Sequence, residues 1–85
     1  MFGEPAWEML LLLYAIGPRE TVSRLAELAH ASKSTAIRWI DYLECQGLVR
    51  REAHPTDKRA LLVELTEKGS DAIRMYLSET SQSED

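Results

Sequence analysis

The chain has 85 residues, of which 45% are hydrophobic, and its formal net charge is −4. This length predicts one domain over residues 1–85 with a single apolar core, and the hydrophobic fraction excludes global disorder. The single cysteine, Cys45, excludes an internal disulfide and a cysteine-based zinc site, and the longest apolar run is too short to span a bilayer. We therefore expect a cytoplasmic protein that has no membrane contact and binds neither a cofactor nor a metal ion.

Charge is distributed unevenly along the sequence. Residues 33–59 carry six basic and four acidic side chains, whereas the rest of the chain carries four basic and ten acidic ones. A negative total disfavours nucleic-acid binding, because neutralising phosphates requires Lys and Arg. The basic middle segment nevertheless offers a local surface for phosphates between two acidic ends.

The first predicted helix is unusually apolar. Residues 1–4 are expected to form a disordered arm, and Pro5 suits the first turn of a helix because its missing N–H would be unpaired there. Residues 6–16 are almost continuously apolar, so more than one face of this helix needs a partner. We expect one face to pack into the domain and a second subunit to cover the surplus; a different protein partner is the alternative. The residues assigned to this interface are Trp7, Leu10, Leu11 and Tyr14.

Two more helices follow in the sequence. Thr21 or Ser23 can cap a short helix that runs to about His30. Ser32 is a favourable N-cap for a helix over residues 32–46, which Gly47 ends as the expected C′ residue. Helical spacing defines a core side of this third helix, made of Ala36, Trp39, Ile40 and Leu43. It defines an opposite, polar side made of Ser34, Arg38, Asp41 and Cys45.

A hairpin and a last helix complete the pattern. Residues 48–53 and 60–65 are strand-like, and the loop between them carries the charged turn 57–59. An Arg at the tip of such a turn can enter a narrow minor groove, where the negative potential is concentrated. Thr66 can cap a last helix that ends near Leu77, with Leu65, Ile73, Tyr76 and Leu77 as its core side; residues 78–85 are expected to form a disordered acidic tail.

This order of elements predicts a mainly α fold with a small β-hairpin wing, which is a winged helix-turn-helix. Residues 25–69 then resemble the MarR family of bacterial winged helix-turn-helix regulators. The matching segments are residues 25–28, 32–38, 43–51, 57–60 and 65–69, and the Asp-x-Arg turn followed by Leu-Thr-x-x-Gly is the most specific of them. The resemblance implies a transcription regulator that binds double-stranded operator DNA, usually as a two-fold dimer. We expect the winged-helix core only, with the long dimerisation helices of the family missing.

The resemblance places Ser34, Thr35 and Arg38 at the major groove. Hydroxyls and backbone N–H groups at a helix N-terminus bind phosphates or base edges, and Arg can reach guanine O6 and N7 or a phosphate. Lys33 suits a backbone contact, and Ile37 either touches a thymine methyl or is buried. Tyr42 replaces an Arg that is frequent in the family.

In the wing, Arg59 matches the Arg that enters the minor groove, and Asp57 matches the companion that holds the turn. The alternative is a solvent-exposed turn whose charges serve only solubility. Arg50 and Arg51 alternate across a strand, so at most one of them faces DNA. The complete set predicted to bind DNA is Ser32, Lys33, Ser34, Thr35, Ile37, Arg38, Tyr42, Arg50, Arg51, Lys58 and Arg59.

The favoured function is therefore a sequence-specific DNA-binding transcription regulator, with the recognition helix 32–46 in the major groove and the wing 50–60 at the minor groove. The alternative is a winged helix that serves as a protein–protein interaction module and does not engage DNA. Catalysis is not expected, because no nucleophile, base and oxyanion set can be assembled. His30 and His54 lie in different turns without further ligands at metal spacing.

Overall fold

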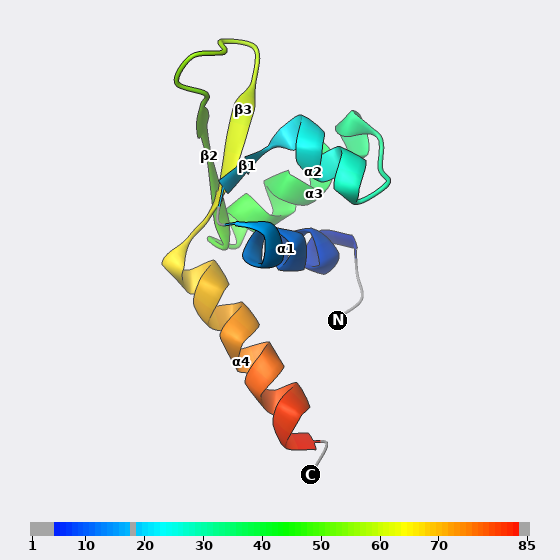
Figure 1. The fold of residues 1–85 in the computed structure, drawn as a ribbon, viewed down its shortest axis with the longest axis vertical. Coiled ribbons are helices and arrows are strands. Elements are labelled where there is room, and N and C mark those ends of the chain that lie inside the picture. Colours follow the sequence, from blue (N-terminus) through cyan, green and yellow to red (C-terminus); the bar gives the residue numbers. More distant parts are fainter. Residues whose placement is uncertain (1–4, 18, 84–85) are drawn as a thin grey trace.

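The computed structural model describes residues 5–17 and 19–83. The elements in chain order are α1 (Pro5–Ile16), β1 (Arg19–Thr21), α2 (Val22–Leu28), α3 (Lys33–Cys45), β2 (Val49–Ala53), β3 (Leu61–Leu65) and α4 (Glu67–Ser83). Within the described ranges α1, α2 and α3 lie beside a small antiparallel sheet while α4 extends below it (Figure 1). None of these described helices combines the length and the hydropathy that crossing a membrane requires.

Helix α1 lies at the centre of the fold, where it packs against α2, α3, α4 and β3. Its side chains Met9, Leu10 and Leu13 have no exposed surface. A helix that is apolar all round is expected in such a central position. Most of the apolar side chains of this helix that were expected to need a second subunit are therefore buried or half-buried within one copy of the chain. Leu10 in particular cannot lie on an interface between subunits, and its assignment there was wrong.

Local capping defines α2 and α3, as the sequence predicts. The Thr21 hydroxyl accepts a hydrogen bond from the Arg24 N–H at 3.1 Å, and the Ser32 hydroxyl accepts one from the Thr35 N–H at 3.2 Å. Each bond satisfies a helix N–H that has no partner within its own helix. After α3, Gly47 adopts a φ of 77°, in the left-handed region that glycine enters at no steric cost.

The sheet has the strand order β1-β3-β2, and both pairs are antiparallel. The hairpin of β2 and β3 was predicted, but β1 was not, because a three-residue strand carries no periodicity. In this register Glu64 of β3 lies opposite both Arg19 of β1 and Arg50 of β2. Arg50 donates to the Glu64 carboxylate at 3.0 Å, and this bond holds the pKa of the Glu64 carboxyl below its ordinary value.

The Leu-Thr-x-x-Gly segment joins α4 to the end of α3. The Thr66 N–H and hydroxyl donate to the carbonyls of Leu48 and Gly47 at 3.1 and 2.7 Å, and Lys68 Nζ donates to the Gln46 carbonyl at 2.9 Å. Three consecutive carbonyls that follow α3 thus have partners from the start of α4. The Thr66 hydroxyl also accepts from the Gly69 N–H at 3.1 Å and so caps α4.

Helix α4 projects away from the rest of the molecule, and its far end lies opposite the β2–β3 loop (Figure 1). Ile73 is buried, and Tyr76 packs edge-on against Trp7 of α1 with ring centroids 5.4 Å apart. Leu77 was predicted on the core side but is 43% exposed. The helix continues to Ser83 through residues predicted to be disordered, because no Gly or Pro interrupts it after Gly69. The predicted disorder of residues 1–4 and 84–85 lies outside the described residues.

Candidate nucleic-acid interface

The N-terminal half of α3 presents most of the side chains predicted to read the major groove. Lys33, Ser34 and Arg38 are exposed, and Thr35 is half-buried. Ser32 is exposed but acts within the chain, since its hydroxyl caps the helix and also donates to the Thr35 hydroxyl at 2.9 Å. Further along, Tyr42 is 54% exposed. This arrangement leaves the first two turns of α3 accessible to a partner.

Ile37 and Trp39 fall between core and surface. Both are half-buried and pack against the apolar core. For Ile37 the sequence left two alternatives, contact with a thymine methyl and burial. Its half-buried side chain packs partly against the core and keeps one part accessible to a partner. Trp39 lies on the predicted core side of the helix, but its side chain is only half-buried.

The turn at the tip of the hairpin is held by the predicted Asp57. Its carboxylate accepts a hydrogen bond from the Arg59 N–H at 3.0 Å, and its carbonyl accepts one from the Ala60 N–H at 3.1 Å. An Asp side chain that bonds to the backbone two residues later stabilises a tight turn. The Lys58 and Arg59 side chains remain exposed at the tip.

His54 is a second residue that holds the wing, and the sequence did not reveal it. Its Nδ1 accepts hydrogen bonds from the backbone N–H groups of Thr56 and Asp57 at 3.2 and 3.1 Å. Its only signal in the sequence was its spacing: a polar side chain precedes the two backbone N–H groups that it binds by two and three residues. In the part of the chain that the structure describes, no three His, Cys, Asp or Glu side chains are placed to share a metal ion.

The structure brings the recognition helix and the wing together. A crevice of about 50 Å³ lies between them, and Lys33 and Ile37 of α3 line it together with Arg59 and Leu61 of the hairpin. Thr21, Val22 and Ser23, where β1 meets α2, form its third side. Lys33 and Ile37, which precede Arg59 by 22 residues or more in the sequence, are therefore its neighbours in space, and all three were predicted to contact DNA.

The ten basic side chains divide sharply by their partners. Six of them bind within the chain: Arg19 to Glu52, Arg24 to Glu27, Arg50 to Glu64, Arg51 to Asp41 and Glu44, Lys68 to the Gln46 carbonyl and Arg74 to Asp71. The other four, Lys33, Arg38, Lys58 and Arg59, are exposed, and their side chains have no partner among the described residues. We call these four the free cations. All four were predicted to bind DNA.

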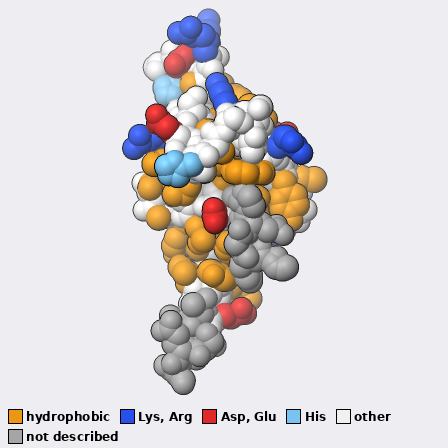
Figure 2. All heavy atoms as spheres, turned by 90° about the vertical axis from the view of Figure 1, so that its right-hand side faces the viewer, with side chains coloured by type: hydrophobic (Ala, Val, Ile, Leu, Met, Phe, Trp, Pro, Cys, Tyr) orange, Lys and Arg blue, Asp and Glu red, His pale blue; other side chains and the backbone are white. Residues whose placement is uncertain are grey.

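Figure 2 shows this polarity on one face of the molecule: Lys and Arg side chains are spread over the upper half, from the tip of the wing downward, and hydrophobic side chains dominate the lower half toward α4. Charged groups without an internal partner are the ones that can neutralise phosphates without first breaking an ion pair. The wing end of the molecule is therefore suited to a polyanion although the total charge is negative.

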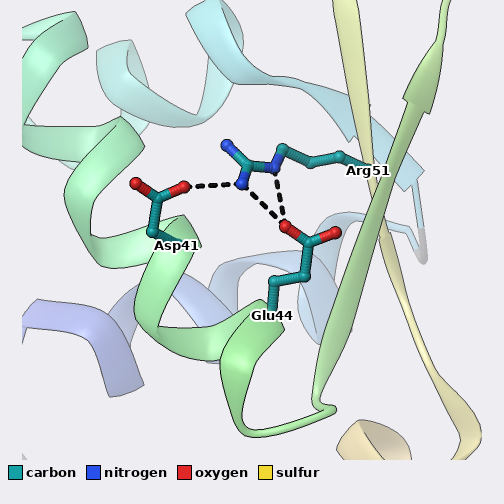
Figure 3. Close-up of polar contacts among 3 residues, drawn as sticks. All are labelled: Asp41, Glu44 and Arg51. Atoms are coloured by element: carbon teal, nitrogen blue, oxygen red, sulfur yellow. Dashed lines mark hydrogen bonds and ion pairs between the residues drawn. The ribbon is translucent and has the colours of Figure 1, made fainter.

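Arg51 does not belong to this accessible set. It reaches from β2 to two carboxylates on α3, as Figure 3 shows. Its Nη2 lies 2.5 Å from Asp41 Oδ1 and 2.7 Å from Glu44 Oε1, and its Nε donates to Glu44 Oε1 at 3.0 Å. Hydrogen bonding to Glu44 raises the pKa of the Arg51 guanidinium above its ordinary value. This geometry commits Arg51 to α3 and argues against its predicted contact with DNA, whereas Arg50, on the opposite face of the strand, keeps a side chain that is 64% exposed.

Comparison with known proteins relates this surface to a family. The family model described as MarR family matches residues 3–61. The HTH-type transcriptional repressor YetL of Bacillus subtilis (strain 168) is 32% identical over 76 residues, which are 88% of this chain and 46% of YetL. AbsC, a MarR family transcriptional regulator from Streptomyces coelicolor, superposes with a TM-score of 0.83 at 33% identity, over 92% of this chain and 53% of AbsC.

A third similar structure is that of the S. aureus MepR–DNA complex, with a TM-score of 0.91 over 99% of this chain and 68% of that chain. At 21% identity, this likeness supports the fold alone. The predicted winged helix-turn-helix fold is thereby confirmed. The chain spans about half the length of YetL and AbsC.

Proposed function

We propose, since this chain belongs to the MarR family, that it is a sequence-specific DNA-binding transcription regulator and not an enzyme. Residues 1–85 would act as one DNA-binding domain, with α3 in the major groove and the wing at the adjacent minor groove. We further propose a cytoplasmic location, as the sequence predicts. YetL is a transcriptional repressor by name, which supports a regulatory role.

The observation that carries this proposal is the position of the free cations. Arg38 lies at the centre of the exposed side of α3, and Arg59 lies at the tip of a turn that Asp57 and His54 hold. An Arg on a recognition helix can bind guanine or a phosphate, and an Arg on a narrow ribbon can enter a narrow minor groove. Lys33 and Lys58 beside them supply contacts to the phosphate backbone that position the protein without reading sequence.

Salt dependence tests the electrostatic part of this proposal. If three or four free cations per copy neutralise phosphates, log K should fall against log salt with a slope of about −3 to −4 per bound copy. The slope is measured by fluorescence anisotropy of a labelled duplex in increasing potassium chloride. Lys58→Ala should reduce the slope by about 1 and leave the preference among sequences unchanged. A slope near zero would be incompatible with DNA binding through this surface.

A second expected result concerns the wing alone. Arg59→Ala should cost about 1 to 3 kcal/mol on sites whose flanks are A/T-rich and little on sites with G/C-rich flanks. The reason is that a narrow A/T minor groove concentrates the negative potential that favours a guanidinium. Equal losses on both kinds of flank would show that Arg59 makes an ordinary phosphate contact or lies away from the DNA.

We also propose that two copies associate through the apolar side chains left exposed on α1 and α4. Tyr14 and Ile16 of α1 are 38% and 47% exposed, and Met75 and Leu77 of α4 are 65% and 43% exposed. Four large apolar side chains in water are unfavourable, and a two-fold contact would bury them while presenting two recognition helices to one duplex. From the interface predicted by the sequence, Leu11, Tyr14 and the partly buried Trp7 remain candidates.

Sedimentation at low micromolar concentration should therefore show a dimer. Met75→Glu, which places a charge among these side chains, should raise the dissociation constant by about tenfold or more. The matched control is Ala53→Glu, a new charge on the exposed end of β2, which should leave the association unchanged. A wild-type chain that stays monomeric over this range would refute the proposed pairing.

A further inference from the structure

The Arg51 cluster joins the two parts of the proposed DNA-binding surface. Asp41 and Glu44 lie one turn apart on α3, and Arg51 lies on β2, which is the first strand of the wing. One guanidinium binds both carboxylates through Nε and Nη2 (Figure 3). The cluster is thus a direct side-chain link between the recognition helix and the wing.

The sheet register places Arg51 in this position. Arg51 lies opposite Val63, between the pairs Val49–Leu65 and Ala53–Leu61. Because side chains alternate along a strand, Arg51 shares a face with the buried Val49, whereas Arg50 points to the other face and pairs with Glu64. The side chain of Arg51 is only 25% exposed, so water screens its ion pairs less than those of Arg24 or Arg74.

The partners of Arg51 argue against a main role in holding DNA itself. Both Nε and Nη2 are committed to carboxylates, and charge-assisted bonds of this kind are about twice as strong as neutral ones. Asp41 lies on the same side of α3 as Arg38, where an unpaired carboxylate would repel phosphates. Arg51 therefore offsets one of the two negative charges on the recognition helix and commits its Nε and Nη2 donors in doing so.

We propose that Arg51 is a positioning residue: its ion pairs with Asp41 and Glu44 hold the wing at one angle to the recognition helix and so set where Arg59 meets the minor groove. This inference rests on the proposed DNA-binding function. The hydrogen bonds of Asp57 and His54 stay within the turn, so they fix its shape but not its angle to α3. The ion pairs of Arg51 with α3 supply a polar link that fixes this angle.

The test compares two duplexes that share a core site, selected from random DNA with the wild-type protein, and differ only in A/T-rich or G/C-rich flanks. For each variant the ratio of the two affinities gives the flank preference. The wild type should prefer the A/T flank by about five-fold or more, and Arg59→Ala should abolish this preference. Arg51→Gln should abolish this preference too. Combining Arg51→Gln with Arg59→Ala should lower the affinity for the A/T-flanked duplex little more than either change alone, because the effects of residues that act as a unit are not additive.

Arg19→Gln is the matched control, since it removes a strand arginine that has one carboxylate partner, Glu52, and lies outside the proposed DNA-binding surface; its flank preference should equal that of the wild type. Asp41→Asn with Glu44→Gln removes the partners and keeps Arg51, so it should also lose the preference. Circular dichroism melting shows which variants fold. If Arg51→Gln does not, the Asp41→Asn/Glu44→Gln variant decides.

Three results would overturn the inference. In the first, Arg51→Gln loses affinity equally on both flanks and lowers the salt slope by about 1, which marks a phosphate contact. In the second, the flank preference survives in Arg51→Gln. In the third, Asp41→Asn/Glu44→Gln gains affinity on both duplexes with an unchanged preference, which marks a purely electrostatic role. Failure of the wild type to bind any duplex would instead refute the proposed function.

Discussion

Replacing Arg38 and Arg59 together by alanine is expected to weaken binding to a selected duplex by about 2 to 6 kcal/mol, or roughly thirty-fold to more than ten-thousand-fold. Each is an exposed cation without a partner among the described residues, and they lie on different elements of the proposed surface. In the proposed function Arg38 would read the major groove and Arg59 the shape of the minor groove, so their losses should add approximately. Gel retardation of the labelled duplex measures the effect.

A matched double variant controls for the loss of two charges. Arg19→Ala with Arg74→Ala removes two exposed cations that pair with Glu52 and Asp71. Exposed ion pairs contribute little to stability, and these residues lie outside the proposed surface, so this variant should fold and bind nearly as the wild type does. If both double variants lose affinity alike, only net charge matters, and the specific roles of Arg38 and Arg59 are refuted.

Gly69→Ala should have the largest effect on folding. A Cβ at position 69 would lie 2.2 Å from the Leu48 carbonyl oxygen and 2.9 Å from Leu65 Cδ1. The Leu48 carbonyl cannot easily move, because it accepts the Thr66 N–H that joins α4 to the end of α3. We expect a loss of about 3 kcal/mol or more in the free energy of unfolding, measured in urea, since overpacking usually costs about 1 to 3 kcal/mol even where side chains can adjust.

Two comparisons sharpen this prediction. Helix propensity alone would favour alanine over glycine within α4 by about 1 kcal/mol, which is the opposite sign. At Gly47 a Cβ would meet only the flexible Lys68 side chain at 3.7 Å. Gly47→Ala should therefore lower the free energy of unfolding chiefly because alanine is unfavourable at this positive φ, by about 1 to 2 kcal/mol. A Gly69→Ala variant that is more stable than Gly47→Ala would contradict the close packing of α4 against Leu48.

The features that sequence predicted are those with a local physical cause. Ser32 caps α3 through a bond to the residue three positions later, Gly47 ends the helix with a positive φ, and Asp57 holds its turn through a bond two positions later. In each case the interacting groups lie within one turn of chain. The wing and the recognition helix could therefore be placed without coordinates.

The features that sequence missed depend on contacts between distant segments. The strand β1 exists because it pairs with β3, which lies more than forty residues later. Leu10 is buried because four elements surround α1. The spacing of apolar residues does not predict how many elements pack against a helix. Arg51 binds Asp41 and Glu44 because the register turns it toward α3, and a one-residue shift would have exposed it to a partner instead.

Selection of random-sequence DNA with the purified protein tests the central claim most directly. Bound duplexes are recovered over several rounds, sequenced and compared with the starting pool. Sequence-specific binding by a two-fold pair predicts one enriched palindromic motif, with half-sites about one helical turn apart and A/T-rich positions where Arg59 meets the flank. Recovery of DNA without any enriched motif, or no recovery at all, would contradict a sequence-specific DNA-binding function.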